Sequence, residues 1–317
     1  MDLDNKWCYM KTRGDAGWET FPSYLDTAVP RIIDFLKERG LNITFFVVGQ
    51  DAALEKNTEA ISQIPAAGHE VANHSFRHEP WLHLYSKEEL IEELQKTEDA
   101  LEKITGVKPK GFRGPGYSVS PTVLEVLADR GYEYDCSILP TYIAPLARAF
   151  FFMKSPGMSA EEREKLKKLY GKFSDGFQTL KPYEWQVGER KIIEIPVTTL
   201  PLLKTPVHAT YLIYLSTFSK FAARSYWKMA LKMCKATGVQ PSLLLHPLEF
   251  LSGEDIPELK FFPGMNLPIE EKLELVSEVL EEYQRNFEVV SMQQHAQIAA
   301  GQKLKSKFVD LNAGVRS

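Results

Sequence analysis

The chain has 317 residues, of which 44% are apolar, and it carries a formal net charge of −4 at pH 7. The apolar fraction is enough for a sizeable core and excludes a disordered chain, and the length suits one large domain or two smaller ones. The slightly acidic balance argues against a broad nucleic-acid-binding surface, so we expect no nucleic-acid partner.

Cysteine usage and the N-terminal segment indicate the compartment. Cys8, Cys136 and Cys234 are widely spaced and form no CxxC pair, which argues against a disulfide framework. We expect three small side chains that are buried or partly buried. The segment MDLDNKWCYM lacks the apolar core of a signal peptide, and no uncharged apolar run reaches the length of about 18 residues that a spanning helix needs. We therefore expect a cytoplasmic protein.

Short apolar runs alternate with amphipathic segments along most of the chain. The helices that we expect cover 30–40, 51–67, 86–104, 121–130 and 267–285. The strands and extended segments that we expect cover 42–48, 69–73, 111–113, 132–138, 192–198, 242–245 and 287–290. This alternation predicts a parallel sheet, and seven or so such units would fill a closed or nearly closed barrel. An open doubly wound sheet is the alternative, and in both cases ligands bind at the C-terminal ends of the strands.

Two segments interrupt this pattern. Residues 139–190 contain the run AFFFM and a charged helix that we expect to begin at Ser159, and we interpret them as an insertion over one face. The segment 211–236 is rich in aromatic and basic residues. Together with AFFFM it indicates either lids packed on the barrel or peripheral contact with a membrane or a lipid-linked substrate. We expect one domain over 1–300 and a C-terminal tail over 301–317.

Asp2 and Asp4 flank Leu3 at the start of the chain, so the strand that carries them would be very short. Residues i and i+2 of a strand point to one side, about 7 Å apart. Two such carboxylates can divide their work, one binding a metal and the other acting as a base.

His74 and His78 stand four residues apart in NHSFRHEP, a spacing that one helical turn or a compact loop brings to one point. Two neutral imidazoles and one carboxylate, with positions left for water, suit a hydrolytic zinc or a related divalent metal. Taken alone, the pair would more often be two surface or hydrogen-bonding histidines.

Three further features end or follow expected strands. His246 closes the apolar run SLLLHP, which places it at the catalytic rim of a barrel. Arg113 in GFRGPGYS can form an ion pair with a carboxylate and keep it ionised. The turn after it, which includes Pro115, Gly116 and Tyr117, exposes backbone N–H groups that could hold an oxyanion.

The ordered set DLD, NHSFRHEP, FRGPGYS, YEYDCS and LLLHP resembles the NodB-homology domain of the polysaccharide deacetylases, carbohydrate esterase family 4. The resemblance covers about residues 1–135 and 190–295 and implies a distorted (β/α)7-8 barrel. It implies that Asp2 is the catalytic base, that Asp4, His74 and His78 hold the metal, that Arg113 orients the base, and that His246 is the general acid. Asp135 would be a further catalytic residue.

The motifs depart from the usual pattern in two places. The first motif is Asp-Leu-Asp where many members have adjacent aspartates, which resembles an intracellular branch of deformylases, cofactor-independent allantoinases and deacetylase-like proteins. The fourth motif has Asp135 but no tryptophan over 136–141, which weakens that assignment.

The resemblance implies a hydrolase that removes acetyl or formyl from an amino sugar in a polysaccharide, an oligosaccharide or a lipid-linked saccharide. Its cofactor would be a divalent cation, Zn²⁺ first and Co²⁺, Ni²⁺ or Mn²⁺ as alternatives. Two alternatives stay open. One is a ring-amide hydrolase of the allantoinase or cyclic-imidase kind, and the other is a barrel that binds saccharide without cleaving it. We interpret the remaining histidines as structural or surface residues: His69, His83, His208 and His295.

Overall fold

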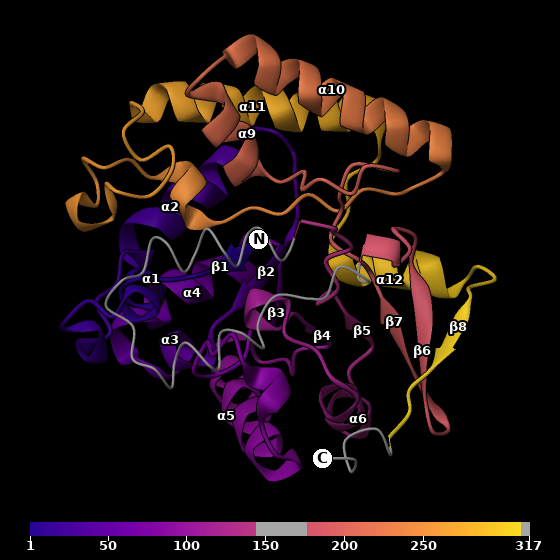
Figure 1. Ribbon diagram of the computed structural model, residues 1–317. Coiled ribbons are helices and arrows are strands. Elements are labelled where there is room, and N and C mark those ends of the chain that lie inside the picture. The colour runs from indigo at the N-terminus through magenta and orange to yellow at the C-terminus, as the bar shows by residue number, and fades with distance from the viewer. Residues whose placement is uncertain (144–175, 312–317) are drawn as a thin grey trace.

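The structure is a computed structural model that describes residues 1–143 and 176–311. Its centre is one eight-stranded sheet in the order β1-β2-β3-β4-β5-β7-β6-β8 (Figure 1). The strands are β1 (Asp2–Leu3), β2 (Thr44–Val47), β3 (Glu70–Asn73), β4 (Gly111–Phe112), β5 (Tyr134–Asp135), β6 (Tyr183–Val187), β7 (Arg190–Glu194) and β8 (Ser306–Phe308).

The first five strands and β7 run parallel, as the sequence predicts, and each follows its neighbour in the sheet. Extended segments fill the space between β7 and β1. Val197 N–H donates to Ile138 O at 2.8 Å, Ser242 N–H donates to Thr198 Oγ1 at 2.6 Å, and Asp2 N–H donates to Leu245 O at 2.9 Å. The sheet therefore bends round into a distorted α/β barrel.

Helices cover the outside of this barrel, with α10 and α11 side by side on one side and α5 and α6 on another (Figure 1). Apolar faces of the helices pack on outward side chains of the strands, for example Phe45 and Val47 against α2 and α4. The helices are α1 (Lys6–Arg13), α2 (Leu25–Lys37), α3 (Gly49–Ala53), α4 (Glu55–Ala66), α5 (Lys87–Thr105), α6 (Pro121–Asp129), α9 (Ala209–Ser216), α10 (Lys220–Thr237), α11 (Ile269–Asn286) and α12 (Met292–Ala300).

Strand register decides which side chains point into the barrel. Asp2 lies opposite Phe46, and Phe46 lies opposite Ala72, so the three share one face of the sheet. Phe46 and Ala72 pack with Tyr134 in a cluster separate from the helix-facing core. Asp2 therefore belongs to the inward-facing set.

Several expected elements have different bounds. The helix expected over 51–67 is two helices, because the extended backbone of Leu54 (φ −92°, ψ 119°) separates α3 from α4. The helix expected from Pro30 begins at Leu25 and contains the proline. The predictions of regular strands over 242–245 and 287–290 are wrong. The edge of β1 bonds once to Leu245 rather than to a full strand.

The predicted insertion over 139–190 and the predicted C-terminal tail each contribute one strand to the sheet. Most of the predicted insertion, including AFFFM and the helix from Ser159, lies outside the described residues. Its last part forms β6, which a tight turn at Gly188 (φ +59°) joins to β7 as an antiparallel hairpin. The predicted C-terminal tail contains β8, which pairs with β6 at the sheet edge.

The aromatic and basic segment 211–236 forms most of α9 and α10. Phe218 and Phe221, where the two helices meet, are 72% and 80% exposed. Among the described residues, no helix combines the length and the apolar character that crossing a membrane requires. The three cysteines are buried and free, as predicted.

Candidate active site

Three predicted metal ligands converge at the C-terminal ends of β1 and β3, the two strands that flank β2. Asp4 follows β1, and His74 follows β3 directly. Asp4 Oδ1 lies 3.1 Å from His78 Nε2 and 3.4 Å from His74 Nε2, and one ligand atom from each residue lies within 4.8 Å of the others. Burial would raise the pKa of Asp4, but the two imidazoles outweigh it and hold this pKa well below its usual value.

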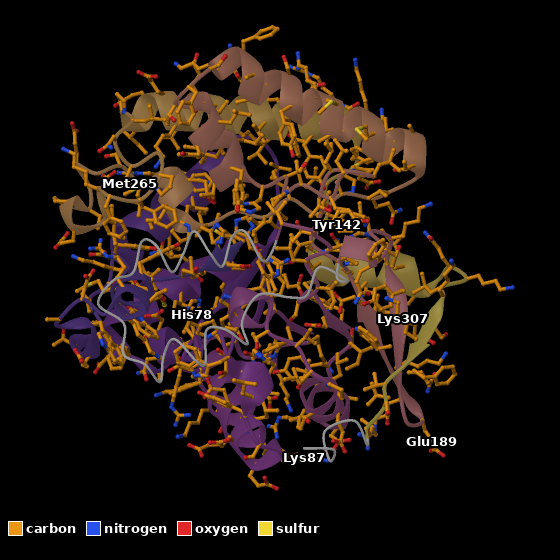
Figure 2. All side chains as sticks on the ribbon, in the orientation of Figure 1. His78, Lys87, Tyr142, Glu189, Met265 and Lys307 are labelled. Carbon is orange, nitrogen blue, oxygen red and sulfur yellow. The ribbon has the colours of Figure 1, made fainter. Side chains whose placement is uncertain are left out.

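The hydrogen bond on the far side of His74 fixes its tautomer. His74 Nδ1 lies 2.7 Å from the carbonyl oxygen of Arg113, which can only accept, so Nδ1 carries a proton and Nε2 is the ring nitrogen that faces Asp4 and could bind a metal. His78 (labelled in Figure 2) has a left-handed backbone (φ 53°) that turns its ring onto the same point. The donor set thus fits a divalent metal without rearrangement.

A buried polar network supports the segment after β1. Asp51, fully buried on α3, accepts hydrogen bonds from Asn5 Nδ2 at 2.7 Å and Trp7 Nε1 at 2.9 Å. Asn5 Oδ1 in turn accepts the backbone N–H of Tyr24 at 3.1 Å, and the Tyr24 hydroxyl donates to the carbonyl of Asp4. These bonds hold Asp4 although β1 has only two residues.

Asp2 pairs with Arg113, as predicted. Arg113 Nη1 donates to Asp2 Oδ1 at 2.5 Å, and the guanidinium stacks on Phe46 with 4.2 Å between Cζ and the ring centroid. Burial would raise the pKa of Asp2, but Arg113 first, and then His74 and His246, outweigh it, so this pKa is lowered. Asp2 is therefore ionised at neutral pH, the state that a general base needs.

His246 meets a carboxylate that the sequence reasoning missed. Glu249, on the short helical turn Pro247–Phe250, accepts the backbone N–H of His246, and its Oε1 lies 3.7 Å from His246 Nδ1. Thr210 donates to the same oxygen at 2.7 Å. Burial would lower the pKa of His246, but Glu249 outweighs it, and this pKa rises to about 9. His246 is then protonated at neutral pH, as a general acid must be.

This pair predicts a pH effect. Replacing Glu249 by Gln removes the charge that raises the pKa of His246, so the imidazolium is lost at lower pH. We expect the alkaline limb of kcat for amide hydrolysis to move down by about one pH unit or more, with the acidic limb unchanged. A pH–rate profile of E249Q beside wild type and the exposed-site control E254Q measures it. If the alkaline limb of E249Q lies at the same pH as that of wild type, Glu249 does not raise the pKa of His246.

The turn predicted to hold an oxyanion is a short helical turn, Pro115–Tyr117. Its own hydrogen bonds use the N–H groups of Tyr117, to Gly114 O at 2.9 Å, and Ser118, to Pro115 O at 3.2 Å. Pro115 has no N–H. Within the described turn this leaves Gly116 as the backbone donor for an oxyanion and corrects the expectation for Pro115 and Tyr117.

Gly114 lets this turn form. A Cβ there would lie 2.2 Å from Ser118 O, a backbone atom that cannot move without unfolding the turn. We expect G114A to lower kcat by about 10²-fold, the cost of losing one oxyanion donor. The matched control is G301A, because a Cβ at Gly301 meets nothing closer than 3.5 Å. Full activity in a G114A protein whose fold is intact by circular dichroism would show that catalysis does not need this turn.

Asp135 lies apart from the other predicted residues. It pairs in register with Phe112 and Glu194 on the outward face of the sheet, whereas Asp2 points inward. Ser137 Oγ donates to Asp135 Oδ1 at 2.6 Å and accepts Gly114 N–H at 2.8 Å. Burial and then Asp135 raise the pKa of Glu194 well above its usual range. Asp135 therefore supports the Pro115–Tyr117 turn through Ser137 and Gly114. Because its side chain lies on the outward face of the sheet, the geometry does not support a catalytic role for Asp135.

Glu249, Asn5 and Asp51 were not identified from the sequence. These residues differ in whether the local sequence indicates their role. Glu249 follows His246 at the capping-box spacing of three residues, with Pro247 between them, so the sequence HPLE could have indicated it. Asn5 and Asp51 carry no such local signal, because 46 residues separate them in the chain. His208, interpreted as structural, has its ring centroid 6.4 Å from that of His246.

Comparison with known proteins agrees with this geometry. Residues 11–134 match the polysaccharide deacetylase family, a region that contains His74, His78 and Arg113. Over 120 residues the chain is 29% identical to a peptidoglycan deacetylase of Helicobacter pylori, which covers 38% of this chain and 40% of that protein. Over 110 residues it is 33% identical to a chitin deacetylase of Colletotrichum lindemuthianum, covering 34% and 44%. The chain thus spans less than half the length of these relatives.

Solved structures extend the likeness to the whole fold. A crystal structure from Mycobacterium smegmatis, named as a polysaccharide deacetylase, has a TM-score of 0.63 at 21% identity and covers 97% of this chain and 90% of that one. An allantoinase has a TM-score of 0.53 at 17% identity, covering 88% and 73%. The fold is the NodB-type α/β barrel that the sequence predicts. The region 11–134 resembles a polysaccharide deacetylase domain.

Proposed function

We propose that this protein is a metal-dependent hydrolase that removes an N-acyl group, acetyl or formyl, from an amino sugar in a saccharide. The observation that supports it best is the convergence of three units at one end of the barrel. These are the Asp4–His74–His78 triad, the Asp2–Arg113 pair and the His246–Glu249 pair. The relatives named as peptidoglycan and chitin deacetylases support an acylated glycan as the substrate class.

Asp4, His74 and His78 would hold the metal, and their two imidazole nitrogens and one carboxylate suit Zn²⁺ first, with Co²⁺, Ni²⁺ or Mn²⁺ as alternatives. A bound ion of this kind supplies Lewis-acid polarisation of the amide carbonyl and lowers the pKa of water. No other group of three or more such side chains in the described residues meets the same spacing.

The protein's own groups carry the proton transfers. Asp2, kept ionised by Arg113, takes a proton from the attacking water. The Gly116 N–H donates to the oxygen on which negative charge develops. His246, kept protonated by Glu249, gives its proton to the departing amine. The products are a free amine on the sugar and a short carboxylic acid.

The test is an assay of acid and amine release with four substrates: N-acetylglucosamine oligomers, a formylated amino sugar, peptidoglycan fragments and allantoin. We expect acetate or formate, with an equal amount of free amine, from at least one saccharide and no opening of allantoin. Hydrolysis of allantoin alone would favour a ring-amide hydrolase. Saccharide binding without any hydrolysis, in protein loaded with each candidate metal, would favour an inactive barrel.

A further inference from the structure

The outer side of α9 and α10 carries a row of exposed aromatic side chains. This aromatic row consists of Tyr211, Tyr214, Phe218 and Phe221, which are 41%, 47%, 72% and 80% exposed. The rings of Tyr214 and Phe218 meet edge to face, with centroids 5.3 Å apart. The inner sides of the two helices already pack on the barrel, for example through Trp227. Single exposed apolar residues are normal, but a run of neighbouring ones indicates a surface that meets a partner.

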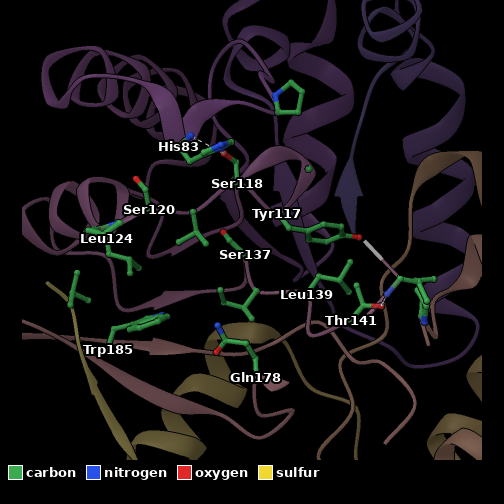
Figure 3. A pocket seen from close by; sticks show the side chains of 18 of the residues that line it. His83, Tyr117, Ser118, Ser120, Leu124, Ser137, Leu139, Thr141, Gln178 and Trp185 are labelled. Atoms are coloured by element: carbon green, nitrogen blue, oxygen red, sulfur yellow. Dashed lines mark hydrogen bonds between the residues drawn. The ribbon is translucent and has the colours of Figure 1, made fainter. Parts of the chain in front are cut away.

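The aromatic row begins at the rim of the candidate active site. Tyr211 stands three residues before Tyr214 on α9, so the two side chains share one side of the helix. Tyr211 also lines a cavity of about 560 Å³ beside the Pro115–Tyr117 turn (Figure 3). The ring centroid of His208 lies 4.2 Å from that of Tyr211 and 6.4 Å from that of His246. The row therefore runs outward from the proposed general acid.

The outer face of α10 is basic as well as aromatic. Phe221, Lys228 and Lys232 stand seven and then four residues apart, so they lie on one face of the helix. The segment 209–237 contains five basic residues and no acidic one, although the whole chain has a net charge of −4. This face therefore differs in charge from the average surface of the protein.

Glutamates of α11 neutralise only part of this positive charge. Lys228 and Lys232 are exposed and make no ion pair with any residue that the structure describes. Their charges are available to an anionic partner outside the protein. The two pairs that α11 forms with α10 are Lys220 Nζ with Glu271 Oε2, at 2.9 Å, and Arg224 Nε with Glu278 Oε2, at 2.5 Å.

We propose that the aromatic row, with Lys228 and Lys232, docks this protein on the surface of a bilayer that contains anionic phospholipid. Phe218 and Phe221 enter the boundary between headgroups and acyl chains, and the lysines meet the lipid phosphates. Tyrosine suits the same boundary, because its ring is apolar and its hydroxyl is polar. Helices that lie on membranes combine an apolar side with lysines in this way.

Docking on this face brings the rim of the active site toward the bilayer, because Tyr211 belongs both to the aromatic row and to the cavity wall. The consequence for the substrate rests on the proposed function. It narrows the acylated saccharide to one that is anchored in the membrane.

Co-sedimentation of the purified protein with lipid vesicles measures the docking. One set of vesicles is phosphatidylcholine alone, and the other is an equal mixture of phosphatidylcholine and phosphatidylglycerol. We expect wild type to bind the mixed vesicles more tightly by about tenfold or more, because Lys228 and Lys232 meet anionic headgroups. Binding should weaken as salt is raised, since both lysines are exposed.

Two double variants separate the aromatic and the basic contributions. Phe218→Ser with Phe221→Ser removes the two most exposed rings of the row, and we expect it to weaken binding to mixed vesicles by about tenfold or more. Lys228→Gln with Lys232→Gln should abolish most of the preference for anionic lipid. All four side chains are exposed, so the variants keep the core intact.

The matched controls are Val107→Ser and Lys103→Gln, at exposed positions near the end of α5, and neither should change binding to vesicles. Equal binding to both kinds of vesicle, or unchanged binding in both double variants, overturns the proposal. It is also overturned if no form binds vesicles and the aromatic variant converts a dimer to a monomer in ultracentrifugation. The aromatic row would then join two copies of the chain.

Hydrolysis assays distinguish a failure of this proposal from a failure of the proposed function. The probes are a glycolipid that carries N-acetylglucosamine, held in mixed vesicles, and soluble N-acetylglucosamine oligomers. The aromatic double variant should lower kcat/KM for the glycolipid by about tenfold and leave that for the soluble oligomers unchanged. Vesicle binding without any hydrolysis would contradict the proposed function and not the docking. Hydrolysis of both probes without vesicle binding would contradict the docking alone.

Discussion

Replacing Asp2 by Asn is expected to lower kcat for amide hydrolysis by about 10²–10⁴-fold, the contribution of a positioned general base. Asn keeps the shape of the side chain and can still accept from Arg113, but it cannot take a proton at neutral pH. Because Asp2 is not one of the three proposed ligands, metal content should stay at the wild-type level. The measurement is kcat together with the metal bound per chain.

The control for this variant is Asp34→Asn, an exposed carboxylate on the outer face of α2. It should retain wild-type kcat and metal content. Near-full activity in the Asp2→Asn protein would contradict the base assignment. Loss of metal along with activity would instead make Asp2 a ligand, so the two readouts distinguish the two roles.

The second large effect is expected from the proposed metal ligands. Replacing His74 by Ala removes a nitrogen donor and leaves the Arg113 carbonyl without its partner. Losing only the hydrogen-bond partner of a metal ligand costs roughly 10–100-fold in metal affinity, and loss of the ligand itself should exceed this. We expect His74→Ala and His78→Ala to be isolated without metal and without activity. Elemental analysis by mass spectrometry measures the content.

His295→Ala is the control for the ligand variants, because His295 hydrogen-bonds to Gln240 away from the triad. It should bind metal as wild type does. If His74→Ala keeps a full equivalent of tightly bound metal, the site formed by Asp4, His74 and His78 is wrong, whatever the activity of that variant.

Features with strong local periodicity were predictable from the sequence. The helix expected over 86–104 is confirmed as α5, which begins after a capping box formed by Ser86 and Glu89. Buried runs such as Thr44–Val47 predicted the parallel strands, because strands covered on both faces are continuously apolar. The hairpin partner β6 was missed because its middle residues are only half-buried. The three residues of β8 are too few, and too exposed, to carry a pattern.

The site was predictable where one short motif carries its geometry, as in His74 and His78. It was not predictable where strand register decides. Asp135 stands beside Tyr134, and the alternation of side chains sends Tyr134 inward and Asp135 outward, a choice that the motif does not encode. The position of His208 beside His246 could not be predicted for another reason. It lies 38 residues before His246, and only the packing of α9 against the rim brings the two rings together.

The most direct test of metal-dependent deacylation is a titration of chelator-treated protein with Zn²⁺, and in parallel with Co²⁺, while acetate release from N-acetylglucosamine oligomers is recorded. Because we propose that one triad holds the metal, we expect almost no release without metal, a linear rise up to one equivalent per chain, and a plateau beyond it. Full activity in metal-free protein, or hydrolysis that His74→Ala supports equally well, would contradict the account.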